Sequence, residues 1–209
     1  MKGYRPMPIF SENTIQGNDI WFADRLGIPS SSRFNEILTA TGIISKQRQK
    51  YLNELAGEKI VGVKPGSYKS AAMIRGAEME AEARMVYAME YEVDVKQVGV
   101  CFPDENRKYC SSPDGLVNNN GLIEIKCCTL PVAVEYLLKG KLPTIYYVQC
   151  QGQLLVTGRK WVDFFSYYPN LPSLTIRVER EPTFLSRLEE EIEKFSYELA
   201  ILVNKLKAM

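Results

Sequence analysis

The chain has 209 residues, 45% hydrophobic and 24% charged, which excludes a disordered or fibrous chain and predicts one domain over residues 1–209. The net charge of +1 indicates no particular partner, and no apolar run approaches the roughly 18 residues of a membrane span, so we expect a soluble, cytosolic protein without membrane contact. The absence of histidine excludes a Ser-His-Asp triad, a Cys-His pair and a zinc-histidine site, and the five cysteines, an odd number without a C-x-x-C pair, argue against a disulfide framework or a zinc ribbon.

Helices and strands are expected to alternate along the chain. Helices are predicted within 12–25, from the N-cap serines at 30–32 to near Gly42, over 71–91, 132–138 and 144–157, and from 182 onward. Residues 46–69 are polar, basic and rich in glycine, which predicts a loop-rich connection. Strands are predicted over 93–102, 109–117, 122–128, 161–168 and 174–178. This order indicates an α/β fold with a mixed central β-sheet flanked by α-helices.

The last predicted helix carries an apolar seam at alternating steps of three and four residues. Its members are Leu185, Leu188, Ile192, Phe195, Leu199, Leu202 and Leu206. Such a seam must be buried. We expect it to pack on the sheet of its own chain, and a contact between subunits is the alternative, because the period alone cannot distinguish them.

Two acidic residues lie on predicted strands that a tight turn joins. Asp114 precedes the Asn-Asn-Asn-Gly turn at 118–121, whose residues tolerate positive φ, and Glu124 follows it. Because side chains alternate along a strand, Glu124 and Lys126 point to one face and their apolar neighbours to the other. A hairpin closing at this turn brings Asp114 opposite Glu124 or close to it. The sequence therefore predicts two carboxylates and one ammonium group on one face of a sheet.

Two close carboxylates repel each other, so one takes up a proton unless a cation is present. An all-oxygen site selects Mg²⁺ or Mn²⁺, and Lys126 can then orient a water or help deprotonate it for attack on phosphorus. These residues indicate a metal-dependent phosphoryl hydrolase. Asp114 is also a common turn residue, however, and Glu124 with Lys126 also suits a solvated strand face. An acid-x-Lys triplet occurs by chance as well, as in Asp94-Val95-Lys96.

Four short motifs in order resemble one nuclease family. Ser112-Pro113-Asp114-Gly115-Leu116 with Leu122-Ile123-Glu124-Ile125-Lys126-Cys127 resembles the core of the phage lambda-type (YqaJ-like) alkaline exonucleases of the PD-(D/E)xK superfamily. Arg25-Leu26-Gly27-Ile28 with Ser30 and Ser32 resembles the N-terminal element of the family, 75–80 resembles its G-x-x-x-E helix, and 147–151 resembles its glutamine-containing helix. The motifs span most of the chain. The resemblance implies a single nuclease domain over 1–209 with a restriction-endonuclease-like core.

The resemblance also implies the residues of a metal site. Asp114 and Glu124 match the main metal ligands of the family, and the carbonyl of Ile125 matches a backbone ligand. Lys126 matches the catalytic lysine, and Glu80 matches a helix carboxylate near a second metal position. The implied cofactor is Mg²⁺, with Mn²⁺ as a substitute.

A second group of residues matches those that hold a 5′-terminal phosphate in this family. They are Arg25, Ser32, Ser112 and Gln149. A guanidinium can grip a phosphate with two hydrogen bonds, and hydroxyl and amide groups can complete the cradle. Without the resemblance, the same side chains would suit a surface ion pair, an N-cap and an exposed helix position. Asp104 falls where a further acidic residue occurs in the family, and it also suits the start of a turn.

The resemblance implies a Mg²⁺-dependent 5′→3′ exonuclease that degrades one strand of linear double-stranded DNA to 5′-mononucleotides. It would leave 3′ single-stranded tails for a phage single-strand annealing protein, act in the bacterial cytoplasm in phage or prophage recombination, and form a ring-shaped homotrimer. A restriction- or repair-type endonuclease is the alternative, although a 5′-phosphate pocket needs a chain end. A catalytically inactive DNA-binding subunit is disfavoured by the retained charged residues. A cysteine enzyme at Cys127-Cys128 is disfavoured because no histidine can activate a thiolate.

Overall fold

The computed structural model describes residues 7–11, 16–63 and 71–209, with the side chains of 71–73 left aside. The helices are α1 (Asp19–Arg25), the 3₁₀ helix η1 (Ser31–Glu36), α2 (Arg48–Val61), α3 (Ala71–Tyr91), α4 (Leu130–Lys139), α5 (Thr144–Thr157) and α6 (Pro182–Lys207). The strands are β1 (Ile9–Phe10), β2 (Val95–Lys96), β3 (Cys101–Phe102), β4 (Gly115–Val117), β5 (Gly121–Lys126), β6 (Trp161–Ser166) and β7 (Leu174–Glu179). None of the helices in the described ranges is long and apolar enough to cross a membrane.

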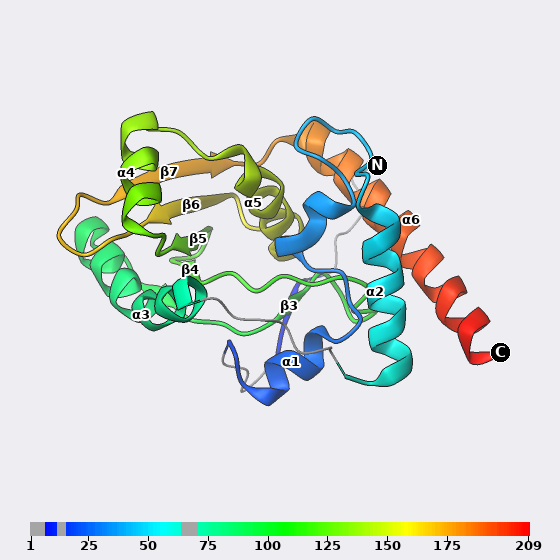
Figure 1. The fold of residues 1–209 in the computed structure, drawn as a ribbon. Coiled ribbons are helices and arrows are strands. Elements are labelled where there is room, and N and C mark those ends of the chain that lie inside the picture. Colours follow the sequence, from blue (N-terminus) through cyan, green and yellow to red (C-terminus); the bar gives the residue numbers. More distant parts are fainter. Residues whose placement is uncertain (1–6, 12–15, 64–70) are drawn as a thin grey trace.

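A five-stranded mixed sheet forms the centre of the molecule, in the order β2-β4-β5-β6-β7 (Figure 1). Strands β5 and β6 are parallel, and α4 and α5 form the crossover between them. The other neighbouring strands of this sheet are antiparallel. Helix α3 lies on one side of the sheet, and α4 and α5 lie on the other (Figure 1). The predicted fold class is therefore confirmed.

Strand β5 is covered on both faces. On one face, Tyr87 of α3 packs in a cluster with Ile123 and Ile125. On the other face, Leu154 of α5 belongs to a cluster that contains Leu122. The predicted alternation along this strand is confirmed, and its polar residues consequently lie under α5 rather than in solvent.

The hairpin between β4 and β5 closes where the sequence predicts. Val117 pairs with Gly121, and Asn118 in the turn has a φ of +43°, which asparagine tolerates better than most residues. Continued by one pair, the antiparallel register sets Asp114 opposite Glu124. The local turn thus aligns the two predicted carboxylates.

The apolar seam of α6 packs chiefly on α2 and α5, so the expected packing on the sheet is wrong. Leu188, Ile192 and Phe195 are fully buried, and the Phe195 ring lies 5.4 Å from the ring of Tyr51 in α2. Figure 1 shows α6 beside α2, at the end of the molecule away from α3 and α4. Because α5 already covers the sheet on this side, the seam meets helices instead.

Helix α2 replaces most of the loop-rich connection predicted over 46–69. Tyr51 and Leu55 are buried on one side of the helix, and this burial outweighs the cost of about 1 kcal/mol that Gly57 brings to a helix interior. The prediction over 46–69 was therefore wrong for these residues. Its part over 64–69 lies outside the described residues.

The helix predicted to end near Gly42 is shortened to the single segment η1, and Ser30 at its start makes no side-chain capping hydrogen bond. The chain turns back soon after it, since Leu38 forms an isolated antiparallel bridge with Ile44. The helix predicted within 12–25 is α1, and residues 12–15 lie outside the described part of the chain.

The strand predicted over 93–102 is divided between two sheets. Its first part, β2, pairs with β4, whereas β3 pairs with β1. The strand predicted over 109–117 narrows to β4, because Ser111 instead forms an isolated bridge with Cys101. Partners from distant segments therefore break both strands.

Contact between α5 and η1 depends on a glycine. A Cβ atom at Gly152 would lie 2.5 Å from Cδ2 of Phe34, so Gly152→Ala should lower the free energy of unfolding by about 1–3 kcal/mol. At Gly57 a Cβ atom would meet nothing within 4 Å, and Gly57→Ala should raise the same free energy by about 0.5–1 kcal/mol. Urea unfolding of both variants measures the two effects, and effects of equal sign would contradict this packing.

Candidate active site

Asp114, Glu124 and Lys126 come together at one end of β5. The amide N–H of Ile125 donates to Oδ2 of Asp114 at 2.6 Å. Nζ of Lys126 donates to Oε1 of Glu124, and it lies 5.0 Å from the centre of the Tyr146 ring. Asp114 is 8% exposed and Glu124 is 2% exposed. The hairpin thus carries two buried carboxylates with one ammonium group beside them.

Helix α5 supplies two amide groups to Glu124. Nε2 of Gln149 donates to Oε1 at 2.6 Å, and Nε2 of Gln153 donates to Oε2. The two glutamines are four residues apart and therefore share one face of the helix. Gln149, expected at a terminal phosphate, points at Glu124 in this structure.

Helix α3 adds a third carboxylate and a guanidinium. Nη2 of Arg84 donates to Oε1 of Glu80, one turn earlier in the helix. Nε of Arg84 donates to the carbonyl oxygen of Asp114 at 2.9 Å. Glu82 points elsewhere and accepts a hydrogen bond from the Tyr167 hydroxyl at 2.6 Å. Arg84 therefore ties the Glu80 turn of α3 to the start of the hairpin.

Burial and neighbouring charges shift the pKa values of this site in opposite directions. Burial raises the pKa of Asp114 well above its usual range, Glu124 and Glu80 raise it further, and Lys126 opposes them. Burial also raises the pKa of Glu80, against the effect of Arg84. Burial lowers the pKa of Lys126, but the charges of Glu124 and Asp114 outweigh it and hold this pKa above its ordinary value. Three carboxylates thus share a region that contains two cations.

This donor set fits a hard divalent cation. In the part of the chain that the structure describes, no three acidic, cysteine or histidine side chains already stand as a ready set of ligands, and Lys126 and Arg84 pair with two of the carboxylates. The oxygen-only donors and their mutual repulsion nevertheless match what Mg²⁺ requires. The groups available to hold it are the side chains of Glu80, Asp114 and Glu124 and the carbonyl of Ile125.

A cavity of about 510 Å³ is bordered by one of the three carboxylates, Glu80, together with Arg84. Arg25, Ser30 and Ser32 border the same cavity. Because Arg84 also contacts Asp114, the cavity adjoins the metal site that the sequence predicts. A hydroxyl- and guanidinium-lined pocket next to an acidic site suits a substrate with more than one phosphate.

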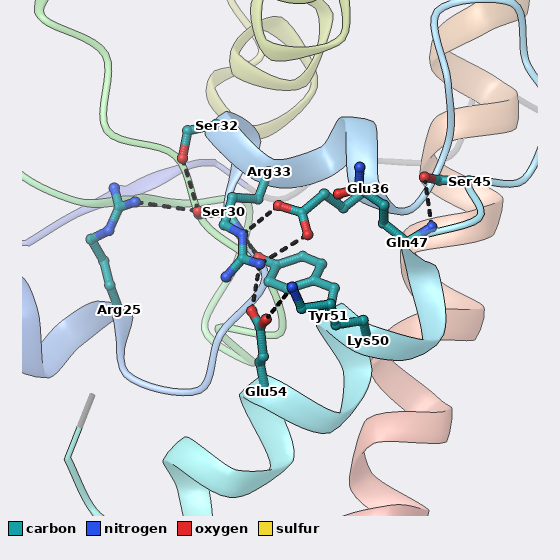
Figure 2. Close-up of polar contacts among 10 residues, drawn as sticks. All are labelled: Arg25, Ser30, Ser32, Arg33, Glu36, Ser45, Gln47, Lys50, Tyr51 and Glu54. Atoms are coloured by element: carbon teal, nitrogen blue, oxygen red, sulfur yellow. Dashed lines mark hydrogen bonds and ion pairs between the residues drawn. The ribbon is translucent and has the colours of Figure 1, made fainter. Parts of the chain in front are cut away.

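Arg25 is held in place from both sides. Its Nη2 donates to Oγ of Ser30 at 3.2 Å, and the hydroxyls of Ser30 and Ser32 lie 3.2 Å apart (Figure 2). The guanidinium lies over the Trp21 ring, 4.1 Å from its centre. The indole N–H of Trp21 donates to Oγ of Ser112 at 2.7 Å. A chain of contacts thus connects Arg25, Ser32 and Ser112. Ser32 is connected to Arg25 through Ser30, and Ser112 through the indole of Trp21.

Two predicted residues already have hydrogen-bond partners within the protein. The hydroxyl of Ser112 donates to the carbonyl of Gly99 at 2.9 Å while it accepts from Trp21, so its only proton is already engaged. Oδ1 of Asp104 accepts from the amide of Asn106 at 2.8 Å in a turn, as a plain turn residue does.

A second layer of contacts fixes the serines of the cavity (Figure 2). The amide of Ser30 donates to the hydroxyl of Tyr51 at 3.1 Å. The guanidinium of Arg33 lies over the Tyr51 ring, 4.0 Å from its centre, and pairs with Glu36 and Glu54. This network connects η1 to α2 behind the serine hydroxyls.

Trp21, Arg84 and Gln153 contact the site without having been predicted from the sequence. Each lies four residues from a predicted residue on the same helix: Trp21 from Arg25, Arg84 from Glu80, and Gln153 from Gln149. Because residues four apart are neighbours on a helix surface, this spacing is the signal that could have found them.

The vicinal cysteines do not suit nucleophilic catalysis. Burial raises the pKa of Cys127 to about 12, and the charges of Glu80 and Asp114 act in the same direction. Burial also raises the pKa of Cys128. Both thiols thus remain protonated near neutral pH, which argues against a thiolate enzyme.

Comparisons with known proteins give a consistent result. Residues 20–160 match the model of the YqaJ-like viral recombinase domain. The alkaline exonuclease LHK-Exo of Laribacter hongkongensis is 35% identical, with a TM-score of 0.83 over 91% of this chain and 97% of that chain. The same enzyme in complex with dAMP gives 34% identity and a TM-score of 0.82 over the same shares.

A phage-related exonuclease from Haemophilus somnus 129PT, at 14% identity and a TM-score of 0.65, covers 86% of this chain and 96% of its own and supports the fold alone. No curated protein matches the chain. The extent of the domain match and the identity to LHK-Exo mean that the chain belongs to the YqaJ-like viral recombinase family and has the restriction-endonuclease-like fold of the lambda-type alkaline exonucleases.

Proposed function

We propose that this protein is a Mg²⁺-dependent 5′→3′ exonuclease that degrades one strand of linear double-stranded DNA to 5′-mononucleotides. The observation that carries the proposal is that Arg25, Ser30 and Ser32 border the same cavity as Glu80 and Arg84. A phosphate-binding pocket beside an acidic site suits a strand whose terminal phosphate and first phosphodiester are both bound. Binding of dAMP by LHK-Exo supports a nucleoside monophosphate as the product.

In this mechanism Arg25 and the hydroxyls of Ser30 and Ser32 bind the terminal phosphate. Asp114, Glu124, Glu80 and the carbonyl of Ile125 would hold Mg²⁺, which supplies charge neutralisation at the scissile phosphate when bound. Lys126 donates hydrogen bonds as an ammonium group, so it would orient the attacking water and stabilise the negative charge that develops on the phosphate oxygens.

The same proposal extends to the biological setting. The 3′ single-stranded tails would serve a phage single-strand annealing protein in phage or prophage recombination in the bacterial cytoplasm, and the enzyme would act as a homotrimer. The viral recombinase description of the family supports the recombination role. A restriction- or repair-type endonuclease is a weaker candidate, because cutting within a continuous strand gives the Arg25 pocket no terminal phosphate to bind.

A time course on a linear duplex with 5′-phosphates, labelled separately at each end, tests the reaction. With Mg²⁺ we expect early release of 5′-terminal mononucleotides, and with EDTA we expect none, because the carboxylates need a cation to bind the scissile phosphate. Covalently closed circles should stay intact. Cutting of circles would indicate an endonuclease, and DNA binding without cleavage would indicate an inactive DNA-binding subunit.

Replacement of the lysine tests the chemical step. Lys126→Ala should lower kcat by about 10²–10³-fold, since it removes a charged donor at the reacting phosphate, while the Kd for duplex DNA stays near that of the wild type. Lys96→Ala is the matched control, because Lys96 ends the chance triplet Asp94-Val95-Lys96 and is exposed on β2. Near-normal turnover by Lys126→Ala would contradict the proposed role.

Recognition of the strand end depends on Arg25. Loss of a charged hydrogen-bond donor costs about 1.5–3 kcal/mol, so Arg25→Gln should slow hydrolysis of a 5′-phosphorylated duplex by roughly 10–100-fold. The rate on a duplex with 5′-hydroxyl ends should change little. Arg187→Gln should behave as the wild type on both substrates, because Arg187 pairs with Glu190 and Glu191 on α6 and does not line the cavity. Equal slowing of Arg25→Gln on both substrates would show that Arg25 does not read the phosphate.

A further inference from the structure

Two glutamines in different environments donate hydrogen bonds to Glu124. Gln149 donates to Oε1, which also accepts from Lys126, whereas Gln153 donates to Oε2. Gln149 is partly exposed, but Gln153 has no exposed surface. Water can replace the first amide if it is lost, and it cannot readily reach the second. Oε2 therefore depends on Gln153 more than Oε1 depends on Gln149.

The orientation of the Gln153 amide is decided by Glu124. A carboxylate oxygen can only accept hydrogen bonds, so the NH₂ group of Gln153 must face it, because the carbonyl oxygen would be repelled. This orientation leaves Oε1 of Gln153 buried without a hydrogen-bond partner in the described structure. A buried carbonyl without a partner is destabilising. An apolar side chain of the same length would remove this carbonyl, but it would leave Oε2 of Glu124 without its donor, so the glutamine is explained by its bond to the carboxylate.

We propose that Gln153 is a positioning residue for the cation site, which holds the Glu124 carboxylate in one rotamer and so sets the affinity for the divalent ion. The inference rests on the proposed function, in which Glu124 is a metal ligand. Hydrogen bonds from a surrounding residue typically change metal affinity or activity by about 10–100-fold when they are lost. A carboxylate held at both oxygens has a fixed plane, whereas one held only at Oε1, by Lys126 and Gln149, can turn and must be ordered when the ion binds.

Direct binding of Mn²⁺ to the full chain without DNA tests this role. Titration followed by the EPR signal of free Mn²⁺ gives the Kd for the wild type and for Gln153→Met, which keeps the side-chain length but removes the amide. We expect the Kd to rise by about 10–100-fold. In the nuclease assay, the Mn²⁺ concentration for half-maximal rate should rise similarly, and kcat should recover at saturating Mn²⁺.

Gln151→Met is the matched control on the same helix. Gln151 is equally buried, but its amide donates to the carbonyl of Glu179 and accepts from the amide of Glu181, away from Glu124. This variant should lower the Tm in EDTA while leaving the Kd for Mn²⁺ unchanged. The same pattern in Gln153→Met, a lower Tm with a wild-type Kd, would overturn the inference.

The other outcomes separate this inference from the function on which it rests. A wild-type protein that binds no Mn²⁺ would overturn the proposed cation site, and the role of Gln153 with it. A wild-type protein that binds Mn²⁺, with an equal Kd for a folded Gln153→Met, would overturn the role of Gln153 alone. If Gln153→Met does not fold, Gln153→Asn keeps a buried amide that is too short to reach Glu124, and it should raise the Kd in the same way. A wild-type Kd for that variant would equally overturn the inference.

Discussion

The negative charge that Asp114, Glu124 and Glu80 place around one end of β5 constrains the rest of the site. Burial raises the pKa of Asp114 and of Glu80, so the carboxylates need donors or cations to remain ionised. Lys126 and Arg84 supply two positive charges from two different elements. A divalent ion would supply the remainder, which is the physical reason that an acidic site of this kind suits metal-dependent phosphoryl chemistry.

Helices on both sides of the sheet supply side chains to this site in pairs that lie one turn apart. Helix α3 presents Glu80 and Arg84 one turn apart, and α5 presents Gln149 and Gln153 one turn apart. Arg84 contacts the start of the hairpin from α3, and both glutamines contact Glu124 from α5. Helix α1 repeats the pattern at the same cavity, where the Trp21 indole, one turn earlier, lies against the Arg25 guanidinium. The site is thus built from helix faces that converge on a single strand pair.

A hydrogen bond and a ring contact between separate segments, rather than one continuous segment, connect the cavity to the carboxylates. Ser112 lies two residues before Asp114 and accepts a hydrogen bond from Trp21, which in turn lies under Arg25. The residues proposed to bind phosphate and those proposed to hold the cation are therefore connected by the loop that leads into β4.

The amino-acid sequence by itself determined the hairpin, the shared face of Glu124 and Lys126, and the register that sets Asp114 opposite Glu124. These features follow from a turn and a strand period that act within about a dozen residues. The contacts of Ser112 and Gln149, the helical state of α2 and the partners of α6 were decided only by the tertiary structure. Ser112 meets an indole 91 residues away, and burial against distant helices outweighs the local preference of a glycine-containing segment, because such contacts depend on partners that no local pattern specifies.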